Sequence, residues 1–287
     1  TRKRPQNFNE LIGQEFVVAT LKNAINQKHI AHAYLFSGPR GVGKTSAARI
    51  LAKALDCEHG PVDTPCGKCV PCIEITRGQS LDVIEIDGAS NTSVNDVREI
   101  RDEVLFSPNS YRYKVYIIDE VHMLSNSAFN ALLKTIEEPP PYIVFIFATT
   151  EIHKVPATIR SRCQQFNFRL ISINDIKGKL ERIVGEMGIK AENEALLWIS
   201  KEATGSLRDA EILLDQIISF SDGAITLKKI KDKLGIVGLD ELNELFIEIS
   251  AGNISKVIEM SNEILNKGVA VEQFVVDLTS YFRNLLL

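Results

Sequence analysis

Apolar residues recur with two different periods along the first 170 residues. Short runs of β-branched and aromatic residues alternate with amphipathic segments in which apolar residues recur every three or four positions. The runs predict strands at 33–38, 81–87, 114–119 and 142–150, with "QQFNF" after Cys163 as a last strand. The amphipathic segments predict helices at 15–28, 45–55, 94–105 and 127–138. This alternation predicts an α/β fold with a parallel sheet covered by helices on both faces.

Beyond about Leu170 the strand signals stop. Helical periodicity predicts a small helical domain from segments at 172–188, 192–203, 206–220 and 226–235. After Gly238 three further apolar stripes follow, made of Leu239, Leu242, Phe246 and Ile249, then Ile254, Val257, Ile258 and Ile264, then Phe274, Leu278, Phe282 and Leu285. We expect these stripes to be core faces first and interfaces second. The predicted domains are therefore 1–170, 171–235 and 236–287.

Composition and charge narrow the class of protein. The chain has 287 residues, 45% of them hydrophobic, which is enough for two or three cores. Neither a signal peptide nor an apolar run of about 20 residues, as a membrane span needs, is visible. The net charge of −4 gives no overall attraction to nucleic acid, and the chain from Ile236 onward contains three basic and eight acidic residues. Such an acidic end favours protein contacts.

Because the chain starts without Met and ends inside a helical pattern, we expect a fragment of a longer protein.

The segment "SGPRGVGKTS", from Ser37 to Ser46, lies between a predicted strand and a predicted helix. It matches a phosphate-binding loop, in which backbone N–H groups converge on phosphates, Lys44 reaches the β and γ oxygens and the Thr45 hydroxyl binds Mg²⁺. The expected ATP-binding residues are Gly38, Pro39, Arg40, Gly41, Val42, Gly43, Lys44 and Thr45. The alternative is a glycine-rich turn with a chance Lys-Thr pair. The strand before it and the helix after it favour the nucleotide site.

A second piece of nucleotide chemistry follows the strand at 114–119. In "VYIIDE", Asp119 is placed to hold Mg²⁺ and Glu120 to polarise an attacking water molecule. The alternative is that the two acids cap the helix that follows. The apolar run before them and the phosphate loop favour ATP hydrolysis.

Four cysteines form a compact pattern between the second helix and the second strand. Cys57, Cys66, Cys69 and Cys72 follow the spacing C-x8-C-x2-C-x2-C, which suits one tetrahedral Zn²⁺ with four protein ligands. Such a site is structural, since no position remains for water. Disulfides or free thiols are the alternative, and an intracellular ATPase is a poor setting for disulfides. Cys163 stands apart and is expected to be a small apolar residue.

In order along the chain, several motifs resemble those of one family. They are "RPQNFNELIGQE", "HAYLFSGPRGVGKTS", "PCGKCVPC", "IIDEVHML", "FNALLKTIEEPP", "FATTE", "SRC" and "GSLRDAE". Together they resemble the AAA+ ATPases, and within them the tau/gamma subunits of bacterial DNA polymerase III clamp loaders. The resemblance implies an AAA+ module at 1–170 with a zinc module at 57–80, a helical lid at 171–235 and the start of a helical collar at 236–287.

The resemblance also implies roles for three more residues. Thr150 matches a sensor of the γ-phosphate or the water, with Thr149 as its rival. Arg208 matches a second sensor; Ser206 and Asp209, at capping-box spacing, would place it in the first turn of a helix. Arg162 matches an arginine finger, which in the family reaches the ATP of an adjacent subunit. For a lone arginine the usual alternative is a surface ion pair.

Partners are implied by the same resemblance. They are delta-type and delta-prime-type clamp-loader subunits, further copies of the chain, the sliding clamp, primer–template DNA and, through a C-terminal tail, the polymerase core; a cytoplasmic location follows. The candidate DNA contacts are Asn91, Thr92, Ser93, Arg98 and Lys134. They lie on or near the starts of two helices, where backbone N–H groups bind phosphate, although capping is the commoner role of such polar residues.

The leading hypothesis is an ATP-hydrolysing clamp-loader motor within the DNA polymerase III holoenzyme, using ATP, Mg²⁺ and structural Zn²⁺. A ring helicase or branch-migration motor is the first alternative, disfavoured by the acidic C-terminal part. A scaffold subunit that does not hydrolyse ATP is the second. This scaffold hypothesis is disfavoured because the chain has the residues expected for hydrolysis, which are Lys44, Thr45, Asp119, Glu120 and Arg162.

Overall fold

The computed structural model describes residues 4–90, 100, 103–220, 223–234, 239–266 and 269–286. The chain separates into two compact units. One holds the residues up to Ile176 together with Ala203–Asp209, and the other holds Lys177–Glu202 and the chain from Ala210 onward. The domain boundaries expected after residues 170 and 235 stay predictions.

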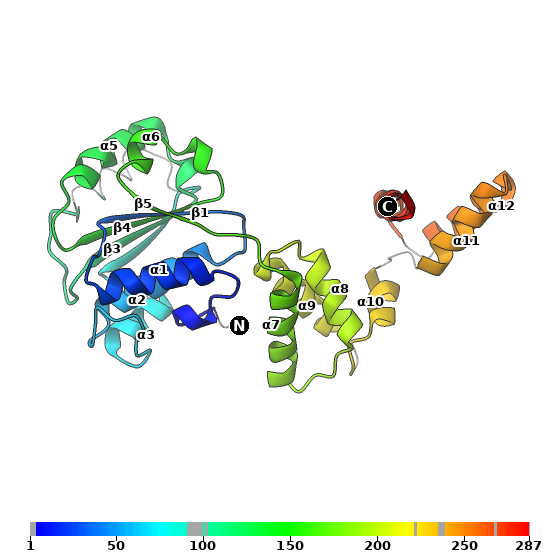
Figure 1. Ribbon diagram of the computed structural model, residues 1–287, viewed down its shortest axis with the longest axis horizontal. Coiled ribbons are helices and arrows are strands. Elements are labelled where there is room, and N and C mark those ends of the chain that lie inside the picture. Colours follow the sequence, from blue (N-terminus) through cyan, green and yellow to red (C-terminus); the bar gives the residue numbers. More distant parts are fainter. Residues whose placement is uncertain are drawn as a thin grey trace. The chain divides into compact units, whose positions relative to one another are not determined.

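A five-stranded sheet forms the centre of the first unit (Figure 1). Its strands are β1 (Ala33–Ser37), β2 (Val83–Asp87), β3 (Lys114–Asp119), β4 (Ile143–Thr149) and β5 (Gln164–Asn167). Their order is β2-β3-β4-β1-β5 and every pair is parallel, so the predicted sheet is confirmed. The three inner strands are almost wholly buried, which explains their continuous apolar sequences.

Helices cover both faces of the sheet (Figure 1). They are α1 (Glu15–Asn26), α2 (Lys44–Asp56), α3 (Val70–Arg77), α5 (Asn126–Glu137) and α6 (Ala157–Arg160), with short 3₁₀ turns η1 (Phe8–Glu10), η2 (Val121–Met123) and η3 (Ile152–Lys154). Side chains of β1 alternate between the faces. Tyr34 and Phe36 pack with α1 and α2, whereas Ala33 and Leu35 pack with α5 and α6. Helix α3, inside the cysteine segment, was not predicted.

The edge at which the parallel strands end is where the sheet can build a site. Ser37 is the last residue of β1 and pairs in register with Thr149, the last residue of β4. On the other side of β4 lies β3, which ends at Asp119. The loops after these three strands therefore leave the sheet side by side, as expected at the carboxyl edge of an α/β sheet.

The rest of the chain is helical, as predicted. Its helices are α7 (Ile173–Glu186), α8 (Asn193–Glu202), α9 (Leu207–Phe220), α10 (Leu227–Leu234), α11 (Leu239–Ser250), α12 (Ile254–Asn266) and α13 (Val271–Leu286) (Figure 1). Within α11 to α13, a small cluster buries Leu242, Leu245, Ile264 and Phe274. In the described part of the chain no helix has both the length and the apolar character that crossing a membrane requires.

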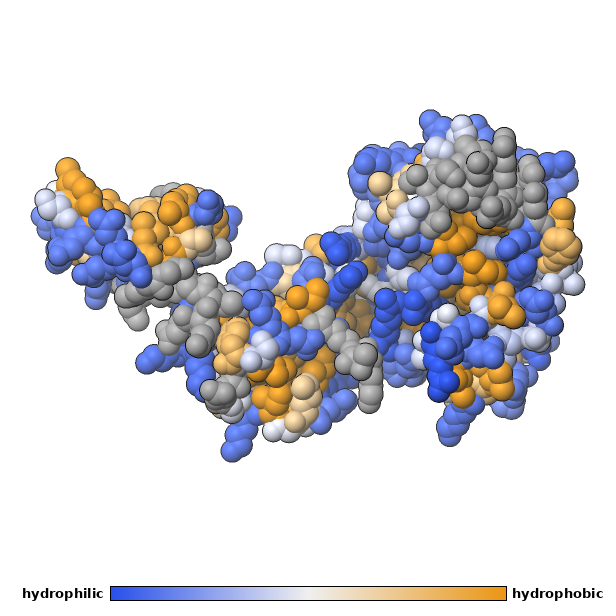
Figure 2. Space-filling view, turned by 180° about the vertical axis from the view of Figure 1, so that it is seen from behind, coloured by the Kyte–Doolittle hydropathy of each residue, from blue (hydrophilic) through white to orange (hydrophobic). Residues whose placement is uncertain are grey.

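Part of the predicted core faces in these last helices is exposed. Ile254 and Ile258 are 73% and 56% exposed, and Ile249 and Leu285 are also exposed. Apolar side chains are visible on the surface of this region (Figure 2). The expectation that the stripes are core faces was therefore wrong for these four residues, because three short helices with a small cluster between them bury only one side of each helix.

Candidate active site

At Gly38 and Gly41 the loop between β1 and α2 runs so close to its neighbours that a side chain has no room. Gly38, Gly41 and Gly43 all have positive φ angles, of 142°, 77° and 102°. A Cβ atom on Gly38 would overlap the carbonyl oxygen of Phe168, and one on Gly41 would overlap the Ser206 hydroxyl. Glycine is therefore required by backbone conformation and by space together.

Lys44 begins α2 and is folded into this loop. Its side-chain amine donates hydrogen bonds to the carbonyl oxygens of Gly38 and Pro39, at 2.8 and 2.7 Å, and the residue is only 6% exposed. Burial lowers the pKa of the Lys44 amine, and the nearby carboxylates of Glu120 and Asp119 oppose that shift. The cation is thus held between glycine-loop carbonyls and two acids.

The next residue connects the loop to β3. The Thr45 hydroxyl donates a 2.6 Å hydrogen bond to Asp119 Oδ2, across 74 positions of sequence. The other oxygen of Asp119 accepts the N–H of Glu120 at 2.9 Å. A hydroxyl and a carboxylate in contact form a small set of hard oxygen ligands, the type that Mg²⁺ prefers.

Glu120 lies beside the end of β4. Its Oε2 accepts hydrogen bonds from the Thr150 hydroxyl and N–H, at 3.1 and 3.3 Å. The rival threonine, Thr149, is completely buried and its hydroxyl contacts His122. Of the two candidates, Thr150 is therefore the one in contact with the carboxylate.

The two candidate arginines occupy different places. Arg208 lies in the first turn of α9, next to the glycine loop. A Cβ atom added to Gly41 would be 3.2 Å from the Cβ atom of Arg208. Ser206 caps this turn by accepting the N–H of Asp209 at 3.3 Å. Arg162, in contrast, pairs with Glu137 of α5 at 2.5 Å and donates a hydrogen bond to the carbonyl oxygen of Thr158 in α6. The structure thus brings Arg208 to the loop and places Arg162 on the surface of α5 and α6.

The cysteine cluster is compact enough for one metal ion. The sulfur atoms of Cys57, Cys66, Cys69 and Cys72 lie within 4.8 Å of one another. The sulfurs of Cys57 and Cys69 are 3.9 Å apart, and tetrahedral ligands at a Zn–S distance of 2.3 Å would be about 3.8 Å apart. Backbone N–H groups of Lys68 and Cys69 lower the pKa of the Cys66 thiol to about 6, whereas burial raises the pKa of the Cys57 and Cys72 thiols.

The remaining sequence candidates are more dispersed. Cys163 packs against the second apolar cluster, and burial raises the pKa of its thiol to about 12, in line with a structural residue. Lys134 is exposed on α5, whose first turn is capped by the Ser125 hydroxyl. Asn91, Thr92, Ser93 and Arg98 lie outside the described residues.

Comparisons with known proteins agree over nearly the whole chain. Residues 13–172 match the family model described as "DNA polymerase III, delta subunit", and residues 175–223 match "DNA polymerase III clamp loader subunit, ATPase lid domain". The chain is 43% identical to the DNA polymerase III subunit gamma of Buchnera aphidicola, over 98% of this chain and 78% of that protein. The chain belongs to the tau/gamma family of DNA polymerase III clamp-loader subunits.

Tau relatives are similar over a smaller share of their length. The chain is 50% identical to the DNA polymerase III subunit tau of Bacillus subtilis and 46% identical to that of Escherichia coli K12. It covers 50% and 43% of those two proteins, so it spans about half of their length. Among solved structures, the Thermotoga maritima RuvB Holliday junction branch migration motor has a TM-score of 0.59 at 20% identity, over 98% of this chain and 90% of that one. This likeness shows that the two chains share a fold.

Sequence reasoning missed two features near the phosphate loop and the Asp119–Glu120 pair. His122, in η2 directly after the Asp-Glu pair, contacts Thr149 and lies near Glu120. The available signal was a histidine two positions after Glu120. A hollow of about 250 Å³ adjoins the phosphate loop at Ser46, and it is lined by Arg4, Pro5, Gln6, Ser46, Arg49, Lys53 and Thr76. Arg4, Pro5 and Gln6 of this lining are the first three residues of the motif "RPQNFNELIGQE".

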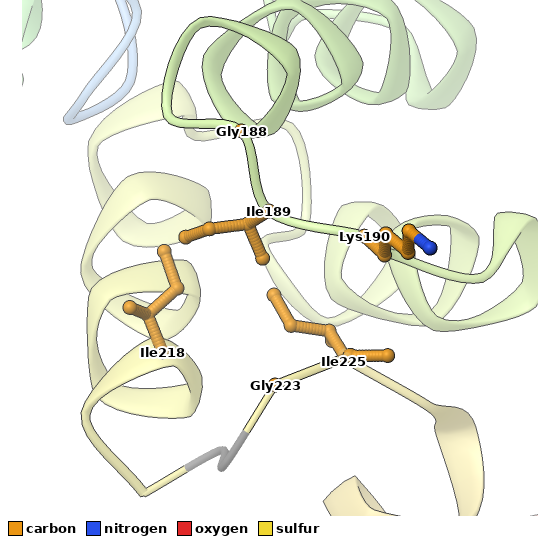
Figure 3. Close-up of a pocket in the computed structure, with 7 residues that line it drawn as sticks. Gly188, Ile189, Lys190, Ile218, Gly223 and Ile225 are labelled. Carbon is orange, nitrogen blue, oxygen red and sulfur yellow. The ribbon is translucent and has the colours of Figure 1, made fainter.

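A second hollow, of about 460 Å³, lies within the helical unit. Ile189, Ile218 and Ile225 point toward one another across it, and Lys190 lies at its margin (Figure 3). No predicted site residue lines it.

The crowding at Gly41 leads to a stability prediction. Gly41→Ala should lower the free energy of unfolding by more than Gly78→Ala, a glycine with a similar φ of 67° and nothing within 4 Å of the added Cβ. Backbone strain alone should cost about 1 kcal/mol, and the overlap with Ser206 should add about 1–3 kcal/mol. Denaturant unfolding of both variants measures the difference. Equal losses would show that the loop has room for a side chain.

Proposed function

We propose that this chain is the ATP-hydrolysing part of a replicative clamp-loader motor, which uses ATP binding and hydrolysis to load a sliding clamp onto primed DNA. Membership of the tau/gamma family supports this proposal. The observation that carries the chemistry is the 2.6 Å contact between Thr45 and Asp119, with Glu120 next to Asp119 and in contact with Thr150.

Nucleotide binding follows from the glycine loop. It leads directly into the start of α2, where the helix dipole and the first N–H groups of the helix favour anions. Lys44 would exchange its two carbonyl partners for phosphate oxygens, which are better acceptors for a cation. Thr45 and Asp119 would hold Mg²⁺, which supplies charge neutralisation at the phosphates when bound.

Hydrolysis then depends on charges placed around the γ-phosphate. Glu120 would polarise the attacking water, while Thr150 keeps the carboxylate in place. Arg208, in the first turn of α9, would add a cation beside the loop. Arg162 would act in trans on the ATP of an adjacent subunit, where a guanidinium stabilises the transition-state charge.

The partners proposed are those of a clamp loader: further copies of this chain, delta-type and delta-prime-type subunits, the sliding clamp, primer–template DNA and the polymerase core. Helix α5, with its Ser125-capped start and the exposed Lys134 in its last turn, is the described element that we propose for phosphate contact with DNA. The cysteine cluster would hold structural Zn²⁺ through four thiolates, which leave no open position for catalysis.

Turnover of ATP by the reconstituted assembly tests the proposal directly. Lys44→Ala should abolish ATP binding, because it removes the loop cation. Glu120→Gln should bind ATP normally but lower kcat by about 10²–10⁴-fold, the range expected for loss of a general base. Rates are measured with and without clamp and primed DNA. A Lys44→Ala assembly that loads clamps as fast as the parent would instead support the scaffold hypothesis.

The trans role of Arg162 predicts dependence on assembly. Arg162→Ala should leave ATP affinity of the isolated chain unchanged, yet lower kcat of the assembly by about 10³-fold or more, as for other arginine fingers. Arg77→Ala, at an exposed position of α3, is the control and should keep the parent rate. Full turnover of the Arg162→Ala assembly would contradict the trans role.

The zinc assignment predicts metal content. The purified chain should contain about one zinc ion, measured by atomic absorption, since four thiolates complete a tetrahedral site. Cys69→Ser should lose the metal and Cys163→Ser should keep it, because Cys163 packs with apolar residues outside the cluster. Equal zinc content in both variants would disprove the assignment.

A further inference from the structure

The His122 side chain lies beside the Glu120 carboxylate. It belongs to η2, the turn after Glu120, and is only 6% exposed. A buried imidazole needs partners for its ring nitrogens, because an unmet polar group in the interior costs free energy. Glu120, Thr149 and Glu151 supply oxygen atoms around the ring.

The two ring nitrogens face different carboxylates. Nδ1 lies 2.9 Å from the Thr149 hydroxyl and 3.4 Å from Glu120 Oε2. Nε2 lies 3.3 Å from Glu151 Oε1. Nδ1 is therefore hydrogen-bonded to Thr149 and lies at ion-pair distance from Glu120, whereas Nε2 lies at ion-pair distance from Glu151. The imidazole links the acid that follows Asp119 to the acid that follows β4.

Glu120 depends on its neighbours for its conformation. Its backbone is left-handed, with φ of 46°, which a non-glycine residue keeps only where the surrounding structure holds it. The Thr150 hydroxyl, the Thr150 N–H and His122 Nδ1 all approach one oxygen, Oε2. Oε1 takes part in none of these contacts, so it is the oxygen that can face a water molecule.

Thr149 holds the His122 imidazole next to Glu120 and Thr150. Its hydroxyl is fully buried, accepts the N–H of Glu151 at 3.0 Å and contacts His122 Nδ1. The next residue, Thr150, holds Glu120 directly. The end of β4 therefore locates both groups that approach Oε2.

The geometry points to His122 as a positioning residue for Glu120, which through Nδ1 keeps the carboxylate against Thr150 with Oε1 available to the attacking water. This inference rests on the proposed function, in which Glu120 polarises that water. Since His122 acts through Glu120 and not on ATP, its loss should lower kcat without weakening ATP binding. A purely structural role would lower binding, turnover and stability together.

Two substitutions of similar size separate the ring nitrogens. Asparagine places its amide nitrogen near the position of Nδ1, and glutamine places it near that of Nε2. With the full-length chain in the reconstituted assembly, His122→Asn should keep kcat within about 3-fold of the parent. His122→Gln should lower kcat about 10-fold or more, because displacement of a catalytic group by about 1 Å can cost up to ~10²-fold. The ATP dissociation constant should stay within about 2-fold of the parent value in both variants, because the contacts of the phosphate loop are unchanged.

Controls guard against misfolding and against a general effect of histidine removal. Thermal unfolding is measured for each variant. Thr149→Val, which removes the hydroxyl beside Nδ1, is a second route to the same displacement and should lower kcat at unchanged ATP affinity. His153→Gln replaces a histidine that is 72% exposed and should keep the parent rate.

The outcomes distinguish this inference from the proposed function. Parent-like kcat in both His122→Gln and Thr149→Val, or equal losses in His122→Asn and His122→Gln, would overturn the positioning role. An assembly of parent chains without ATP turnover would refute the proposed function, and this inference with it.

Discussion

The pairing of β4 between β1 and β3 is the constraint on which the whole candidate site depends. Parallel strands end at one edge, so the register that sets Ser37 opposite Thr149 also brings the loop after β1 next to the end of β3. Lys44, Asp119 and Thr150 come from three separate segments and meet there through short connections. The hydrogen bond from Thr45 to Asp119 then ties α2 to the neighbouring strand, so helix and sheet hold the acids in one arrangement.

Local patterns were sufficient to predict the sheet. Adjacent residues such as Phe145 and Ile146 are both buried because they face opposite helical layers, and only a doubly covered sheet needs such continuous apolar runs. The spacing of Cys66, Cys69 and Cys72 likewise restricts the chain to tight turns, so the cluster could be predicted before any contact was known.

Contacts between distant segments could not be predicted in the same way. Nothing near Gly41 in the sequence indicates that the Ser206 hydroxyl excludes a side chain there, and nothing near His122 indicates Thr149 as its partner. Periodicity has a similar limit. It identifies Ile254 and Ile258 as one apolar face of a helix, but burial depends on whether another element covers that face.

The ion pair with Glu137 neutralises the charge of Arg162 within this chain. Both side chains are partly exposed, at 35% and 45%, so solvent weakens the pair and its loss costs at most about 1 kcal/mol. If Arg162 acts in trans as proposed, its guanidinium must first leave Glu137, and the exposure of both side chains keeps the cost of that step small.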